Sequence, residues 1–494
     1  MEIIKPTPKN PPRPALLSSD EGSFAYTSAA YRWPVIITKI IDDVYKTRHL
    51  LPILKNENDN NHSKRMEIEE KNREGKEIMD SIAGLKYQMQ RGKKLIPIED
   101  DGESDIDNWN YVFHKYFERE NWYSAAWLFT ECYLYRRIRS IFAKTKHWHD
   151  YDPFFRQKSE SFKASINSVI EISKRIDQLI ITATTATMAT STSTLLDQQR
   201  IIFHELVLIS LWGNATDLSL LPNLNHEDIK KLQNTGDKLL KESEKNILAN
   251  DLDKVWNVIS KYRKTRIDFI LDNAGFELFG DLILADWLIQ TEYASEIHFH
   301  VKSIPWFVSD TTIFDFNWLL KTLNDISDNN SDNINDNNSD KNIKNIKNIK
   351  IDNISDANSI KKLINRWQIY IKKNQWIIET HHFWTSPYSY WHMSEQAPDL
   401  YLNLSKSSLI IYKGDLNYRK LVYDCKWSIT NTSFKEAIGP LASEKDSSPP
   451  LLALRTCKAE VLVGIDESRI PSFDDEKDWM YSGKYAVIQF HHHH

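Results

Sequence analysis

The spacing of apolar positions divides the chain into two regions. Over residues 34–212 these positions recur at helical intervals. Trp127, Leu134 and Ile138, for example, lie seven and four positions apart and share one stripe. This region predicts a bundle of helices. A Thr/Ala/Ser tract from Thr182 to Thr194 interrupts the pattern, and its β-branched, hydroxyl-rich composition favours a surface loop.

From residue 261 onward, short apolar runs alternate with helical patterns. The run Arg266–Leu271 ends in Asp-Asn-Ala-Gly and precedes a helical pattern over Phe276–Ile289. This alternation predicts an α/β fold, a doubly wound, mostly parallel Rossmann-like sheet with helices on both faces. Five further strand candidates follow the first: Glu296–His300, Gln375–Glu379, Ser408–Tyr412, Leu451–Arg455 and Tyr485–Gln489.

The same patterns predict the domain organisation. A disordered, Pro-rich start over residues 1–20 precedes a helical domain over 21–260, which packs on an α/β domain over 261–490. Residues 324–358 are about one third Asn, with near-repeats of Asn-Ile-Lys, so we expect a disordered insertion there. Residues 491–494 are four histidines, which we interpret as a remnant of a purification tag.

Composition excludes several classes of protein. In a chain of 494 residues, 41% apolar and 12% aromatic side chains suffice for a substantial core. The 63 basic and 68 acidic side chains argue against a general binder of nucleic acid or anionic membranes. Three distant cysteines, Cys132, Cys425 and Cys457, provide neither a disulfide framework nor a zinc cluster. With neither a signal-peptide pattern nor a membrane-length apolar run, we expect a location in the cytoplasm, or also in the nucleus.

Oxygen-bearing side chains stand at the predicted carboxyl ends of two strands. Asp272 and Asn273 follow the first strand, and Glu277 falls in the first turn of the next helix. Because neighbouring strand ends share one edge of a parallel sheet, Asp310, after the second strand, could complete an all-oxygen site for a hard divalent cation. The alternative is that these residues only form turns and cap helices.

A polar segment follows the Ser408–Tyr412 run. Gly414 allows close approach of the backbone to a ligand, Asp415 and Asn417 can bind sugar hydroxyls, and Lys413 can bind phosphate oxygens. Leu416 belongs to the same segment. A turn with solvated lysines is the alternative.

Arg455 and Lys458 close another apolar strand. Lys458 would place a point charge at the same edge, where it could neutralise a phosphoryl group. Arg455 could act similarly or brace a carboxylate, and solvation of both cations is the alternative. Cys457 has no evident His or Asp partner, so we expect a small buried side chain rather than a nucleophile.

Other polar residues carry weaker signals. His298 and His300 alternate on a predicted strand, and His147 and His149 repeat that spacing, as metal ligands sometimes do. Packing or local hydrogen bonding is the commoner role of such pairs. Asn214, in the polar segment that ends the helical region, remains a candidate for substrate binding.

Six segments, in order, carry the features of one family: Tyr31–Ile37, Leu211–Ser219, Leu271–Glu277, Ile304–Asp310, Lys413–Lys420 and Arg455–Lys458. Together they resemble the metal-dependent damage-control phosphatases of the sugar-phosphate type, whose subfamily III carries an Arg-Thr-x-Lys signature. The resemblance extends from about residue 20 to residue 488. The Asn-rich insertion, the Thr tract and the Pro-rich start depart from it.

The resemblance implies a divalent metal, such as Mg, Mn, Co or Ni, at Asp272, Asn273 and Asp310, with Lys458 as a further catalytic residue. It implies substrate contacts by Glu277, Lys458 and the loop from Lys413 to Asn417, to which we add Arg455 and Asn214 as candidates. The implied activity, in metabolite damage control, is hydrolysis of small sugar phosphates such as fructose 1-phosphate, fructose 6-phosphate or related ketose phosphates. A metal-bound water or Asp272 itself would attack in line.

Two rival functions remain. The same family has been linked to S-adenosylmethionine-dependent methylation of protein glutamates, so a protein-glutamate O-methyltransferase is the alternative. The chain has only 13 glycines and no Gly-rich cofactor loop after the first strand, whereas an all-oxygen metal site has a clear use in phosphoryl transfer. A non-catalytic scaffold is the third reading. No feature predicts an oligomeric state.

Overall fold

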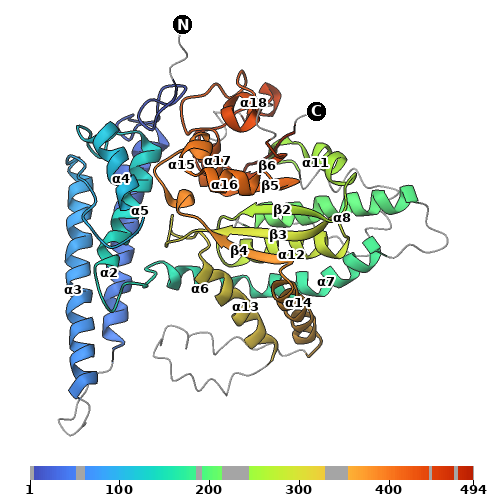
Figure 1. Cartoon of the computed structure of the whole chain (residues 1–494), viewed down its shortest axis with the longest axis horizontal. Helices are drawn as coiled ribbons and strands as arrows, with labels where there is room; N and C mark the ends of the chain where they lie inside the picture. Colours follow the sequence, from blue (N-terminus) through green and yellow to red (C-terminus); the bar gives the residue numbers. More distant parts are fainter. Residues whose placement is uncertain are drawn as a thin grey trace.

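The computed structural model describes residues 5–51, 62–184, 192–213, 244–328, 354–443, 448–471 and 477–492. A sheet of seven strands lies at its centre, in the order β1-β7-β6-β5-β2-β3-β4 (Figure 1). The strands are β1 (Ile247–Asn250), β2 (Thr265–Ile270), β3 (Ala294–Val301), β4 (Trp376–Thr380), β5 (Leu409–Lys413), β6 (Leu451–Thr456) and β7 (Ala486–His491). Neighbouring strands are parallel except β6 and β7, which are antiparallel, so the predicted mostly parallel α/β sheet is confirmed.

Side chains alternate between two hydrophobic cores, one on each face of the sheet. On β2, Ile267 and Phe269 enter one core while Ile270 enters the other, as the two-residue period of a strand requires. The core that contains Ile267 and Phe269 also contains the helices α7 (Ile166–Thr184), α8 (Thr192–Trp212), α11 (Leu252–Ile259), α12 (Phe276–Gln290), α13 (Ile313–Ser327) and α14 (Ile354–Lys372). Of these helices, α7, α13 and α14 lie below the sheet in Figure 1.

Helix α12 is buried along nearly its whole length because its sequence is apolar on every side. A Cβ atom at its Gly280 would lie 3.3 Å from the backbone oxygen of Ile209, so glycine lets α8 pack closely on α12. This contact fixes the helix that begins directly after the Asp272-Asn273 segment.

The opposite face of the sheet is covered by short helices: α15 (Met393–Gln396), α16 (Pro398–Leu404), α17 (Gly414–Leu421) and α18 (Phe434–Ala437). Four 3₁₀ turns accompany them: η5 (His382–Thr385), η6 (Tyr390–His392), η7 (Gly439–Ala442) and η9 (Glu467–Arg469).

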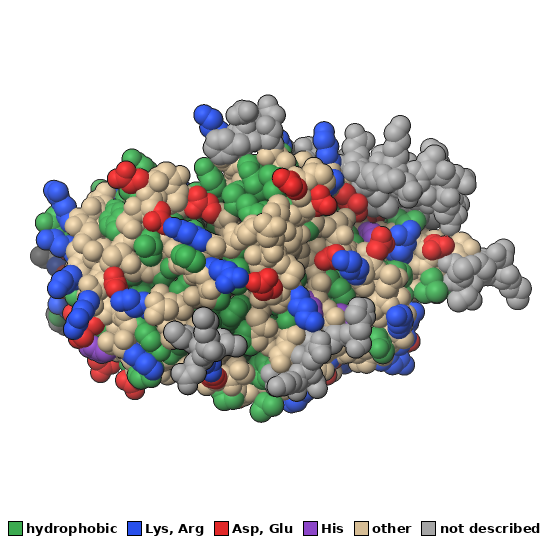
Figure 2. Space-filling view, turned by 90° about the horizontal axis from the view of Figure 1, so that it is seen from above, with side chains coloured by type: hydrophobic (Ala, Val, Ile, Leu, Met, Phe, Trp, Pro, Cys, Tyr) green, Lys and Arg blue, Asp and Glu red, His purple; other side chains and the backbone are tan. Residues whose placement is uncertain are grey.

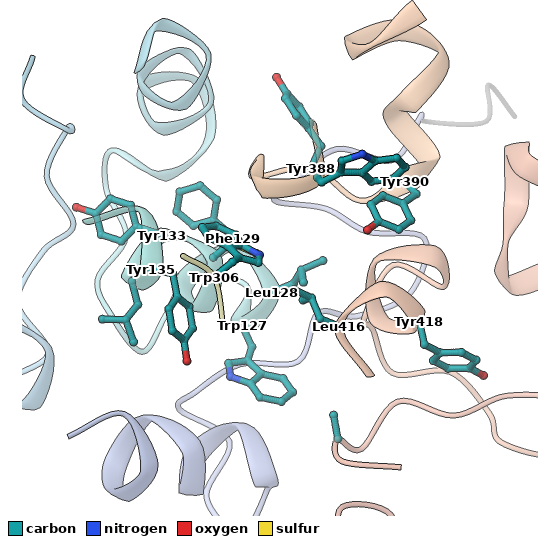
Figure 3. Close-up of a cluster of buried hydrophobic side chains, with 14 of the residues drawn as sticks. Trp127, Leu128, Phe129, Tyr133, Tyr135, Trp306, Tyr388, Tyr390, Leu416 and Tyr418 are labelled. Atoms are coloured by element: carbon teal, nitrogen blue, oxygen red, sulfur yellow. The ribbon is translucent and has the colours of Figure 1, made fainter. Parts of the chain in front are cut away.

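A separate layer of helices stands at one end of the sheet (Figure 1). It contains α1 (Phe24–Thr27), the π-helical turn η1 (Ser28–Arg32), α2 (Trp33–His49), α3 (His62–Gln90), α4 (Ile106–Val112), the π-helical turn η2 (Phe113–Phe117) and α5 (Trp127–Ala143); α6 (Phe155–Ala164) leads out of it. Aromatic side chains of α5, including Trp127 and Tyr135, gather with Trp306 from the loop after β3 and Leu416 from α17 (Figure 3). This cluster joins the layer to the sheet body.

The surface is mixed in charge. Figure 2 shows Lys and Arg side chains interspersed with Asp and Glu over the face seen from above. None of the described helices combines the length and the apolar character that crossing a membrane would demand.

The structure differs from the predicted domain boundaries. Strand β1 joins the sheet and α7, α8 and α11 pack on it, so the sheet body begins well before residue 261. The first 20 residues are not disordered throughout: Ala15 bridges to Cys425 and Leu17 to Ala126, which fixes this part of the start against the body.

Three smaller predictions also change. Helices α7 and α8 continue into the Thr tract as far as Thr184 and from Thr192, and the residues between lie outside the described part of the chain. Helix α13 extends to Ser327 and α14 begins at Ile354, so the ends of the predicted insertion are helical, while residues 329–353 are not described. His491 is the last residue of β7 and pairs with Leu451, so the sheet includes the first of the four histidines that the sequence ascribes to a tag remnant.

One buried carboxylate makes the stability of this fold depend on pH. Glu205 of α8 is fully buried and forms an ion pair with Arg175 of α7. Burial raises the pKa of Glu205 from 4.5 to about 7, against the opposing effect of Arg175. The folded protein therefore binds this proton more tightly than the unfolded chain, and stability decreases as pH rises from about 4.5 through 7.

We expect the free energy of unfolding of Glu205→Gln, relative to that of wild type, to increase by about 1–3 kcal/mol when the pH is raised from 5 to 8. The reason is that glutamine carries no charge to desolvate, whereas Glu205 ionises over this range. Guanidinium unfolding followed by tryptophan fluorescence at both pH values measures the difference. Asp253→Asn, at an exposed carboxylate of α11, is the control. An equal Glu205→Gln effect at the two pH values would contradict this explanation.

Candidate active site

The order of strands reverses direction next to β2. From β2 the chain adds β3 and β4 on one side and then returns to add β5 and β6 on the other. The loops after β2 and β5 therefore diverge around a crevice at the carboxyl edge, where α/β sheets commonly bind ligands. Most of the residues that the sequence singled out lie at this edge.

The loops after β2 and β3 are joined by backbone pairing. Asn273 and Asp310 form an isolated antiparallel bridge, with the Ala274 amide 2.8 Å from the Ser309 oxygen. The Thr311 amide lies 2.7 Å from the Asp272 oxygen. Asp272, Asn273 and Asp310, which are 38 positions apart at most, therefore occupy adjacent places.

Three acidic side chains are buried in this region: Asp272, Glu277 and Asp310 are 5%, 2% and 2% exposed. Asn273 lies among them and donates from Nδ2 to Asp272 at 3.0 Å and to Glu277 at 2.8 Å. Its own oxygen accepts a hydrogen bond from Ser309. Burial, followed by the charges of Glu277 and Asp310, raises the pKa of Asp272 well above its ordinary value.

Two lysines that sequence reasoning missed support Asp310. Lys302 is buried, and its Nζ lies 3.2 Å from Asp310 Oδ2 and 2.9 Å from the Leu271 oxygen. Lys158 of α6 donates to the Asp310 backbone oxygen at 3.0 Å. A lysine directly after an apolar strand was the available signal for Lys302, whereas nothing in the local sequence pointed to Lys158.

The loop that carries Asp310 is strained. Phe307 and Val308 have φ angles of 44° and 73°, in the left-handed region that side chains with a Cβ rarely adopt. Such residues cost of order 1–3 kcal/mol each. Phe307 stacks on Tyr135 of α5 with ring centroids 4.5 Å apart, so the helical layer helps to hold the turn that presents Ser309 and Asp310.

The segment from Lys413 to Lys420 is not a loop. It forms helix α17, which begins at Gly414 with Lys413 as its N-cap residue. Gly414 has φ +83°, and a Cβ atom there would lie 1.9 Å from Asp272 Oδ2. Only glycine therefore lets the start of α17 approach this carboxylate, and the free amides of a helix start favour an anion nearby.

Lys413 and Asn417 hold the start of this helix in place through ion pairs and hydrogen bonds to the sheet and to neighbouring helices. Lys413 Nζ lies 3.2 Å from Glu277 and 2.9 Å from Asp281, and it donates to the Ser210 oxygen at 2.6 Å. Asn417 Nδ2 donates to the backbone oxygens of the β2 end and of Lys413. Both side chains are fully buried and satisfied by protein groups.

Arg455 braces Asp415, one of the two roles left open for it. Its Nε donates to Asp415 at 2.9 Å, and its Nη2 donates to the Ala459 oxygen at 2.8 Å. Asp415 also accepts from the Lys458 amide at 3.0 Å. Arg455 is completely buried, so it fixes the turn that carries Lys458.

A cavity of about 600 Å³ lies between these strand ends and the helical layer. Six of the predicted site residues line it: Asp272, Asn273, Asp310, Asp415, Leu416 and Lys458. Five others are not part of the lining but contact residues that are or support the same loops: Glu277, Lys413, Gly414, Asn417 and Arg455. Asn214 falls outside the described residues. The opposite wall comes from η1, α2 and α5, which sequence reasoning did not connect with the site.

The histidine pairs act elsewhere. His300 Nε2 lies 2.8 Å from Asp268, and His298 Nδ1 lies 3.1 Å from Glu379, which are local hydrogen bonds across the sheet. Cys457 is buried, and burial raises the pKa of its thiol to about 11, as expected for an inert side chain.

His147 belongs to a second group of metal-ligand types. Its ligand atom and those of Glu70 and Glu74 lie within 4.8 Å of one another. However, the Glu74 oxygens already accept the backbone amides of Lys146 and His147, at 3.1 and 2.9 Å, and Lys146 Nζ lies 3.1 Å from Glu70. These hydrogen bonds and this ion pair show that the group holds α3 against the loop after α5.

Comparison with known proteins agrees with this architecture. The model of the damage-control phosphatase ARMT1-like domain matches residues 28–470. The curated relative "Damage-control phosphatase ARMT1" of Xenopus laevis is 34% identical, and the alignment covers 96% of this chain and 98% of the relative. The protein of the same name from Homo sapiens is 34% identical over 97% and 98% of the two chains.

A solved structure of a duf89 family protein from Pyrococcus horikoshii aligns over 93% of this chain and 96% of its own, at 12% identity and a TM-score of 0.38, a likeness too weak to bear on the fold or site. The family model and the full-length relatives, in contrast, confirm the resemblance drawn from the six segments. The chain belongs to the damage-control phosphatase ARMT1-like domain family.

Proposed function

We propose that this chain hydrolyses small sugar phosphates with the help of a divalent metal held by Asp272, Asn273 and Asp310. The observation that carries the proposal is the burial of three carboxylates around one amide at the carboxyl edge of the sheet, beside a cavity that Lys458 also lines. Family membership supports the reaction class. Fructose 1-phosphate, fructose 6-phosphate and related ketose phosphates are the substrates we propose.

The side chains suit a hard cation. Two carboxylates and an amide oxygen are the donor set that Mg²⁺ or Mn²⁺ prefers, and Co²⁺ or Ni²⁺ also accept it. Burial, followed by repulsion from Glu277 and Asp310, raises the pKa of Asp272, and a cation shared between Asp272 and Asp310 would offset both effects. When bound, such a cation would polarise the phosphoryl group and stabilise the charge that develops on its oxygens.

The protein groups around the cavity define the rest of the reaction. The free amides at the start of α17 and the ammonium of Lys458 receive the phosphoryl oxygens. Asn273 holds Asp272 and Glu277 in place by its two hydrogen bonds. Either Asp272 or a water beside it attacks the phosphorus in line, and the ester P–O bond breaks as the sugar oxygen leaves and takes a proton from water. If Asp272 attacks, water then hydrolyses the phosphorylated carboxylate to release phosphate. Asp415 on the same wall accepts from sugar hydroxyls.

Methyl transfer is not favoured as the activity. A cluster of buried carboxylates that repel one another gives no advantage to a reaction at a sulfonium methyl group, whereas it fits a cation that binds phosphate. We propose the cytoplasm as the site of action, with the nucleus also accessible.

Replacing Asp272 or Asp310 by Asn should lower phosphate release at least about 100-fold, because each change removes a charged ligand for the cation and a fixed negative charge from the site. Release from a panel of sugar phosphates, with the protein treated with chelator and then given Mg²⁺, Mn²⁺, Co²⁺ or Ni²⁺, measures the effect.

Asp42→Asn, at an exposed carboxylate of α2, is the matched control and should retain wild-type rates. Methyl incorporation into protein is assayed in parallel. Chelator-insensitive release that survives in both site variants, or methyl transfer without release, would refute the proposed function.

Gly414→Ala should abolish most activity, again by about 100-fold or more, because the added Cβ would collide with Asp272 Oδ2. Gly22→Ala is the matched control: Gly22 has φ +85°, nearly the same backbone conformation, but nothing lies within 4 Å of its Cβ position.

Both alanines therefore pay the backbone cost of about 1–2 kcal/mol, and only Gly414→Ala displaces a site residue. Melting temperature and kcat are measured for both. Similar kcat values in the two variants would show that the contact between α17 and Asp272 is not needed for the reaction.

A further inference from the structure

The cavity has a second wall that carries its own charges. Six residues of η1 and α2 line it: Tyr31, Arg32, Val35, Ile36, Lys39 and Ile40. From Arg32 onward, their spacing of three, one, three and one places them on one face of the helix, which is the face turned toward the strand ends. Two of the six are cations, so this wall offers positive charge across from the proposed metal site.

Arg32 is held in a defined position without an acidic partner. Its guanidinium lies 4.7 Å from the centre of the Phe24 ring, and Nη1 lies 3.1 Å from the Ser28 hydroxyl oxygen. Within the described part of the chain, no carboxylate comes within ion-pair distance of it. The remaining N–H donors of Arg32 are therefore available to a ligand.

The other arginine of the cavity lining is different. Arg419 donates to Glu131 at 2.7 Å and to Asp424 at 2.8 Å, and it lies 3.9 Å from the centre of the Trp127 ring. Two carboxylates saturate this guanidinium, so it serves to brace the wall. Of the two arginines in the lining, Arg32 is thus the one that protein groups hold in place without a carboxylate partner.

The backbone conformation at Arg32 supports the same conclusion. Arg32 is the last residue of η1, a π-helical turn inserted between α1 and α2. Such turns are rare and occur frequently at functional sites, because the extra residue redirects a side chain. Here the turn separates α1 from α2 at the point where the chain faces the cavity.

Arg32 and the acidic strand ends line the same cavity from different elements. Burial and the charges of Glu131 and Asp310 raise the pKa of Tyr135, while Arg32 lowers it, so this phenol lies within reach of both fields. Lys458, in contrast, acts on Asp272. The cavity therefore has one cation beside the proposed phosphoryl position and another on the opposite wall.

We propose that Arg32 is a specificity-determining residue, and that the preferred substrate carries a second acidic group, a carboxylate or a phosphate, which Arg32 binds while the phosphoryl ester lies at the strand ends. This inference rests on the proposed phosphatase function. An arginine fork matches the oxygens of either group, and the buried Phe24 ring beneath the exposed guanidinium holds it in place.

Two pairs of esters test the inference. Glycerol 3-phosphate and 3-phosphoglycerate differ by a carboxylate, and fructose 1-phosphate and fructose 1,6-bisphosphate differ by a phosphate. We expect wild-type kcat/KM to be at least about tenfold higher for the doubly acidic member of one pair, and that pair identifies the group. Initial rates of phosphate release are measured at constant ionic strength with the metal that supports the highest rate.

Arg32→Gln should reduce this preference to about twofold or less, mainly through KM, and Arg32→Lys should restore part of it because the charge remains. Arg91→Gln is the matched control, since Arg91 is an exposed arginine that stacks on Tyr87 at 5.9 Å away from the cavity. It should leave both members of each pair unchanged.

Equal losses on both members of a pair in Arg32→Gln, or a wild type without preference, would overturn the inference while leaving the phosphatase intact. Absence of metal-dependent release from every ester would instead refute the proposed function. Calorimetric binding of 3-phosphoglycerate and glycerol 3-phosphate to Asp272→Asn, with and without Arg32→Gln, tests the role of Arg32 even without turnover. Equal affinities of the two esters for Asp272→Asn would count against it.

Discussion

Like charges buried together at the carboxyl edge of the sheet determine how the rest of this molecule is built. Carboxylates removed from water repel one another strongly, and each costs several kcal/mol unless a cation or hydrogen bonds compensate. Here Asn273 donates to Asp272 and Glu277, and two buried lysines, Lys302 and Lys413, lie beside Asp310 and Glu277. Burial, followed by the charges of Glu277 and Asp310, raises the pKa of Asp272, and an environment that disfavours buried negative charge in this way favours a bound cation.

The surrounding structure prevents these groups from moving apart. The bridge between Asn273 and Asp310 joins two loops, and the close approach of Gly414 brings a third element, α17, against Asp272. Arg455 and Asp415 fix the turn of Lys458 in the same way. The helical layer then closes the cavity through the contact of Phe307 with Tyr135. Rigid supports of this kind are what a preorganised site requires.

The sequence predicts the strands and the edge where the site lies, because apolar runs and the polar residues after them are local features. It does not predict β1, which has only four residues, or the antiparallel direction of β7, which depends on pairing with distant β6. For Lys413, the alternation of side chains along the strand already indicated on which face of the sheet its side chain lies. Lys413 continues the alternation of Leu409 and Ile411, which face α8 and α12, so its side chain had to point behind the site.

The turn at Phe307 and Val308 has a consequence for attempts to engineer this protein. A β-branched residue at φ 73° stores backbone energy that glycine would release, so a screen that scores thermal resistance alone would select glycine at that position. The same substitution would make the turn that positions Asp310 more flexible. Thermal stability and catalytic rate therefore make opposite demands on residue 308, and selection for both together should keep valine there.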